Sequence, residues 1–154
     1  MRFGNVKHFL ALSCAVASVQ ASSRVLAVCA GSEGVALYVA PKSTGWTGDT
    51  VKKGSFTFLM KDNGEPDILI KDANEKTFSV VDDGSLVLAP FFDADQGTFT
   101  FILISKKATS VQTYQLSDVG NGKRVMLWTD VKNRTAGILT KVSAYIAGCE
   151  PAVR

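Results

Sequence analysis

The chain has 154 residues, the length of one ordinary domain, and 46% of them are apolar. Its formal net charge of +3 falls to +1 if Arg2 and Lys7 are removed with an N-terminal leader, because 15 basic residues then face 14 acidic ones. A near-neutral chain whose lysines and arginines are scattered excludes an extended basic surface for nucleic acid.

The N-terminal stretch has the layout of a secretory signal peptide. Residues 2–8 carry the positive charge, residues 9–19 are uncharged, and small residues follow. The apolar run is shorter than the ~20 residues of a membrane-spanning helix. We therefore expect residues 1–21 to be removed after Ala21, or alternatively after Ala17. Residues 22–154 are then one β domain without a transmembrane segment, located in a periplasm or outside the cell.

Three cysteines are present: Cys14, Cys29 and Cys149. Cys14 would leave with the signal peptide, and an exported chain with two remaining cysteines usually pairs them. Because chain termini often lie close together in compact domains, a Cys29–Cys149 disulfide is predicted. A lipid anchor on Cys14 or Cys29 is the alternative, although neither cysteine follows a well-formed anchoring sequence.

Short segments rich in Val, Ile, Phe, Thr and Tyr alternate with Gly/Asn/Asp turns through most of the mature chain. This spacing predicts an antiparallel meander of roughly eight to ten short strands. An all-β fold follows, with a small closed or nearly closed barrel favoured over a two-sheet sandwich. Residues 40–53 are expected to form the one long irregular loop.

The only histidine, His8, lies in the predicted leader. The mature chain therefore lacks a histidine general base and histidine metal ligands. Asp93 and Asp95 resemble the start of a calcium loop, but the later ligands are absent and a hairpin turn explains the stretch. No metal, cofactor or catalytic residue is predicted, and a hydrolase that uses two carboxylates is an unsupported alternative.

Three aromatic residues are the candidate partner-binding residues. Trp46 lies in the expected loop among small residues, and Phe91 and Phe92 are adjacent, so that a strand would point them to opposite faces. Exposed aromatic side chains are common anchors of protein interfaces. The alternatives are that Trp46 covers the core and that one phenylalanine is buried while a loop covers the other.

Three further aromatic residues lie opposite the clearest aliphatic stripes of their segments: Tyr114, Trp128 and Tyr145. We interpret them as surface ladders that stabilise cross-strand pairs, or as the lining of a second layer.

In size and layout the predicted domain is similar to the periplasmic inhibitors of C-type lysozyme, which are small exported barrels with one disulfide. Those inhibitors insert a Ser-Gly-x-x-Tyr loop into the enzyme, and this sequence has no such stretch, so no site residue is carried over. The sequence predicts a monomeric, non-catalytic exported protein that binds a protein or an envelope component. A carrier of a small apolar ligand inside the barrel is the second hypothesis.

Overall fold

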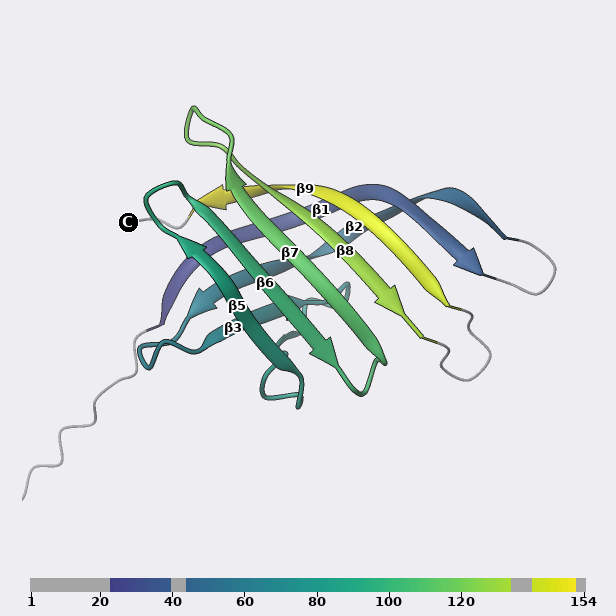
Figure 1. Ribbon diagram of the computed structural model, residues 1–154, viewed down its shortest axis with the longest axis horizontal. Coiled ribbons are helices and arrows are strands. Elements are labelled where there is room, and N and C mark those ends of the chain that lie inside the picture. The colour runs from purple at the N-terminus through teal and green to yellow at the C-terminus, as the bar shows by residue number, and fades with distance from the viewer. Residues whose placement is uncertain (1–22, 40–43, 134–139, 152–154) are drawn as a thin grey trace, which may run out of the picture.

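The computed structural model describes residues 23–39, 44–133 and 140–151 (Figure 1). Its elements are all strands: β1 (Arg24–Val39), β2 (Thr44–Met60), β3 (Pro66–Lys71), β4 (Thr77–Ser79), β5 (Leu86–Asp93), β6 (Thr98–Ser105), β7 (Ser110–Asp118), β8 (Arg124–Lys132) and β9 (Lys141–Pro151). The predicted leader, residues 1–21, lies outside the described residues. No helix in the described ranges is long and apolar enough to cross a bilayer.

The nine strands form one antiparallel sheet in the order β4-β3-β2-β1-β9-β8-β7-β6-β5. Figure 1 shows the sheet strongly curled into a half-barrel, with β3 opposite β5. The predicted all-β meander is confirmed, and the presence of a single sheet favours the barrel-like form over the sandwich. Tight turns close the hairpins as expected; for example, the amide of Lys61 donates to the carbonyl of Glu65 at 2.8 Å.

The first and last strands meet in the middle of the sheet because β1 pairs with β9. Cys29 lies directly opposite Cys149 in this pair, and the two form the predicted disulfide. Cys29 is fully buried, so the bond faces the interior of the half-barrel. A covalent link therefore joins the two meanders that make up the sheet.

Aromatic rings fill the interior. Phe58 packs against Phe101 and Tyr114, with ring centroids 5.1 and 5.3 Å apart, and all three side chains are fully buried. Tyr114 stacks on Trp128 at 5.8 Å, and Trp128 stacks on Tyr145 at 4.4 Å. Tyr114, Trp128 and Tyr145 therefore form a cross-strand ladder. The ladder lies in the interior, however, so our interpretation of it as a surface feature is wrong.

The expected loop over residues 40–53 is also corrected. Residues 44–53 belong to β2, a strand of 17 residues, and only residues 40–43 lie outside the described ranges. The pairing of β1 with β2 shifts between Ala30 and Ser32, where Gly31 adopts a φ of 61°. Glycine accepts this conformation without steric cost, and such a bulge bends a strand.

Candidate functional site: the outer face of the sheet

Apolar side chains form a continuous row on the outer, convex side of the half-barrel. Each member pairs directly with the next across seven neighbouring strands: Trp46, Leu37, Val142, Val131, Val111, Ile104 and Leu86. Four members are clearly exposed, between 44% for Val131 and 61% for Trp46. The other three are half-buried. Contact with water does not stabilise exposed apolar side chains, and a continuous row of them is unusual on the surface of a monomer.

Two further rows lie beside the first, at two-residue steps along the strands. The second row is uncharged: Gly48, Val35, Ala144, Thr129, Thr113, Ile102 and Leu88. The third row has one charge, on Glu33: Thr50, Glu33, Ile146, Leu127, Gln115, Thr100 and Phe91. We call these three rows the outer face.

The inner side of the same strands carries a few buried polar groups among its large apolar side chains. In β8, Met126, Trp128 and Asp130 are buried, whereas Leu127 and Thr129 between them are exposed. Alternation with a period of two places successive side chains on opposite faces, so β8 turns Trp128 and Asp130 inward and Leu127 outward.

A hydrogen-bonded cluster explains how the interior accepts charge. The carboxylate of Asp49 accepts hydrogen bonds from Nζ of Lys141 at 2.8 Å and from the hydroxyl of Tyr145 at 2.6 Å. These two bonds lower the pKa of Asp49 from 3.8 to about 2. Burial lowers the pKa of Lys141, but its bonds to Asp49 and Tyr145 outweigh that effect and raise it above its ordinary value.

Gly34 permits this cluster to span three strands. It lies on β1 between Asp49 on β2 and Tyr145 on β9, with which it pairs on either side. A Cβ at position 34 would overlap the carbonyl oxygen of Ala144, so the backbones of β1 and β9 approach too closely for a side chain.

Asp130 is a second buried acid on the inner side. It is 1% exposed, and burial raises its pKa above 3.8. Its Oδ2 lies 3.5 Å from Nζ of Lys132, whereas Oδ1 has no hydrogen-bond partner among the described residues. Neither of the two hollows described below is lined by Asp130 or Asp49.

The three candidate partner-binding residues are all exposed. Trp46 is 61% exposed and Phe91 69% exposed, and both lie on the outer face. Phe92 is 42% exposed, and its ring packs against Phe99 at 4.8 Å. Five strands separate the strand of Trp46 from the strand of Phe91, so the three residues do not form one compact cluster. Their role in binding stays a prediction.

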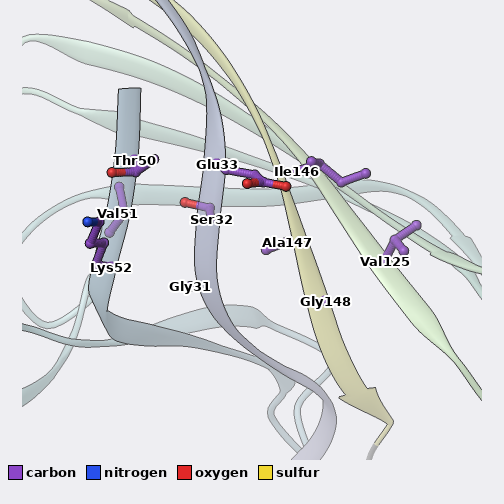
Figure 2. A pocket seen from close by; sticks show the side chains of 10 residues that line it. All are labelled: Gly31, Ser32, Glu33, Thr50, Val51, Lys52, Val125, Ile146, Ala147 and Gly148. Atoms are coloured by element: carbon purple, nitrogen blue, oxygen red, sulfur yellow. The ribbon is translucent and has the colours of Figure 1, made fainter. Parts of the chain in front are cut away.

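A hollow of about 490 Å³ lies where the outer face meets the bulge of β1 (Figure 2). Four strands line it: β1 with Gly31, Ser32 and Glu33, β2 with Thr50, Val51 and Lys52, β9 with Ile146, Ala147 and Gly148, and β8 with Val125. Its volume is within the range of small-ligand sites.

A second hollow, of about 1100 Å³, lies where β1 begins, beside the β7–β8 turn. Its buried cation already has partners. Nε of Arg124 donates to Asp118 at 2.6 Å, and its Nη1 donates to the carbonyl of Leu26 at 2.6 Å. This hollow therefore offers no unsatisfied buried charge to a ligand.

The calcium-like stretch is a turn. The carboxylate of Asp93 accepts a hydrogen bond from the amide of Gln96 at 3.0 Å, as expected for a side chain that closes a hairpin. Within the described ranges, no group of three or more His, Cys, Asp or Glu side chains is arranged to hold a metal ion.

Sequence reasoning missed most of the outer face because its members come from seven strands and share no local motif. The available signal was the aliphatic stripe of β8, with Val125, Leu127 and Val131 at alternate positions. No known family model, curated protein or solved structure matches this chain.

Proposed function

We propose that this protein is a non-catalytic exported binding protein that holds a protein partner on its outer face. The observation that carries the proposal is the apolar row, which runs from Trp46 to Leu86 across seven strands with four members exposed. Burying exposed apolar surface is the main driving force of protein association. Two of the candidate aromatics, Trp46 and Phe91, would act as anchors at opposite ends of the face, whereas Phe92 lies on the other side of β5 against Phe99.

The size of the outer face suits a stable interface. Across the sheet the outer face covers seven strands spaced about 4.8 Å apart, and along the strands it covers three two-residue steps of about 6.8 Å each. The product of these two dimensions is an area of roughly 700 Å². One partner contributes about 800 Å² to a standard interface.

A protein fits this face better than lipid does. The second and third rows interleave aliphatic side chains with hydroxyl and amide groups, including Thr129 and Gln115, and contain Glu33. Hydrocarbon offers these groups no hydrogen-bond partner, whereas a protein surface does.

A second copy of the chain is also disfavoured as the occupant. The outer face is convex, so two copies facing each other would touch only along a narrow strip. A partner with a concave or adaptable apolar surface covers the whole face. The protein would itself be a monomer and bind a different protein.

An exported location agrees with the Cys29–Cys149 bond, which is compatible with an oxidising compartment. The alternative of an apolar ligand inside the barrel gains no support, because Phe58, Phe101 and Tyr114 already fill the space. The outer face is therefore the better candidate for binding.

Site-specific photo-crosslinking in the native host tests the proposal. A photoreactive amino acid replaces Val131 or Leu127 on the outer face, and Glu65 in the exposed β2–β3 turn serves as the control position. We expect one crosslinked protein of fixed mass from the two outer positions and none from the control. Adding Trp46→Lys should abolish this crosslink without changing the thermal midpoint, because Trp46 is 61% exposed.

Three results would contradict the proposal: crosslinks to lipid, crosslinks to a second copy of the chain, or no crosslink from either outer position. An identical crosslink in the Trp46→Lys variant would show that Trp46 is not an anchor.

A further inference from the structure

The hollow of Figure 2 combines apolar walls with two opposite charges that do not pair with each other. Glu33 extends from β1 and Lys52 from β2, and both are exposed. Neither has an ion-pair partner among the described residues. From this arrangement we propose that the hollow binds a short apolar peptide with free termini, its ammonium group facing Glu33 and its carboxylate facing Lys52.

A buried hydroxyl without a partner supports a ligand in this hollow. Ser32 is 6% exposed, lines the hollow, and its Oγ has no hydrogen-bond partner among the described residues. Figure 2 shows this hydroxyl pointing from β1 toward β2. An unsatisfied buried hydroxyl destabilises the folded chain, and a polar atom of the ligand would relieve that cost.

The backbone around the hollow is irregular in a way that suits a peptide. Ala30 pairs with Ser55 and Ser32 with Val51, so three residues of β2 face only Gly31 on β1. The regular ladder is interrupted there. Backbone groups at such a break can bond to the amides of a short peptide.

The apolar part of the ligand would contact Val51, Val125 and Ile146, which come from three different strands. The volume of about 490 Å³ exceeds that of a single amino acid and accommodates a dipeptide. This site is independent of the partner proposed for the outer face, because it needs only the hollow and its two charges.

Gly148 provides a variant that fills the hollow without disturbing the fold. A Cβ at this position would meet nothing within 4 Å, and the residue does not have a positive φ. Gly148→Leu therefore places a side chain in the hollow. Gly45→Leu is the matched control, because Gly45 is also an exposed strand glycine with open space around it, away from the hollow.

The experiment is calorimetric titration of leucyl-leucine into the purified protein with its disulfide intact. We expect binding by the natural protein and by Gly45→Leu, and its loss in Gly148→Leu. Glu33→Gln and Lys52→Gln should each weaken binding about threefold, the effect of one exposed ion pair. N-acetyl-leucyl-leucine has no ammonium group, so it should bind Glu33→Gln and the natural protein equally well. Leucyl-leucinamide has no free carboxylate, so it should bind Lys52→Gln and the natural protein equally well.

Ser32→Ala should change the stability of the protein and its affinity for the peptide in opposite directions. Removing the unsatisfied hydroxyl should raise the thermal midpoint of the unliganded protein and weaken peptide binding.

The proposal is overturned if the natural protein shows no heat of binding up to about 10 mM peptide, if Gly148→Leu binds as well as Gly45→Leu, or if both blocked peptides bind as tightly as leucyl-leucine. Each of these results leaves the crosslinking test of the outer face unaffected.

Discussion

Replacing Asp49 with asparagine tests the charged cluster on the inner side of the sheet. The carboxylate has a pKa of about 2 in the folded protein, against an ordinary value of 3.8, because Lys141 and Tyr145 donate hydrogen bonds to it. At 1.36 kcal/mol per pKa unit, the charged form contributes about 2 kcal/mol to stability. The side chain is 25% exposed, so solvent screening reduces this value only partly.

The sign of the pH dependence follows from the lowered pKa. The contribution is fully present above pH 3.8 and is lost as the pH falls through about 2. Asp49→Asn cannot ionise, so its free energy of unfolding should be about 2 kcal/mol below that of the natural protein at pH 7. The two proteins should converge as the pH falls from about 4 to about 2.

Urea denaturation followed by circular dichroism at several pH values measures this gap. Asp95→Asn is the control, because Asp95 is an exposed turn residue outside the cluster; it should match the natural protein throughout. A gap that stays constant from pH 7 to pH 2, or no gap at pH 7, would refute the reasoning.

Three more predictions concern stability. Asp130→Asn should raise the free energy of unfolding at pH 7, because burial raises the pKa of Asp130 in the folded protein. The gain should shrink as the pH falls through this raised pKa and should be gone below the ordinary value of 3.8; a gain independent of pH would contradict this account. Gly34→Ala should lower the free energy of unfolding by about 2 kcal/mol or more, because its Cβ would overlap the backbone of β9. Gly45→Ala should leave the free energy of unfolding almost unchanged. Equal effects of the two variants in urea denaturation would contradict the close approach of β1 and β9. Replacing both Cys29 and Cys149 with alanine should cost roughly 2–5 kcal/mol, since the disulfide closes a loop with a sequence separation of 120; an unchanged urea midpoint would contradict that contribution.

The fold class could be predicted from the sequence because its signals are local. Gly/Asn/Asp turns separate segments with alternating side chains, and Phe56 and Phe58 in β2 mark the inner face correctly. The disulfide followed from elimination and from the usual proximity of chain ends. The curled sheet and its strand order required the long-range pairing of β1 with β9, which no local pattern encodes.

The orientation of β8 could not be predicted because both of its faces contain apolar residues. One face has Val125, Leu127 and Val131, and the other has Met126 and Trp128 with charged neighbours. Hydrophobicity alone favours the aliphatic face as the core. The structure turns the other face inward because the large rings fill the interior of the half-barrel and the guanidinium of Arg124 finds hydrogen-bond partners there.

The position of Trp46 was mispredicted for a related reason. Its glycine neighbours, Gly45 and Gly48, are poor strand formers, and they suggested a loop. Pairing with Leu37 on the long strand β1 overrides this local preference. The apolar row that results is visible only after the register of seven strands is known.

The orientation of the outer face is the central claim, and fluorescence quenching of the two tryptophans tests it most directly. Trp46→Phe leaves only Trp128, and Trp128→Phe leaves only Trp46, so acrylamide reports each side of the sheet separately. With Trp46 61% exposed and Trp128 8% exposed, we expect strong quenching of Trp46 with red-shifted emission and weak quenching of Trp128 with blue-shifted emission. Stronger quenching of Trp128 than of Trp46 would mean that the opposite faces of the strands point outward, and the proposed binding face would be lost.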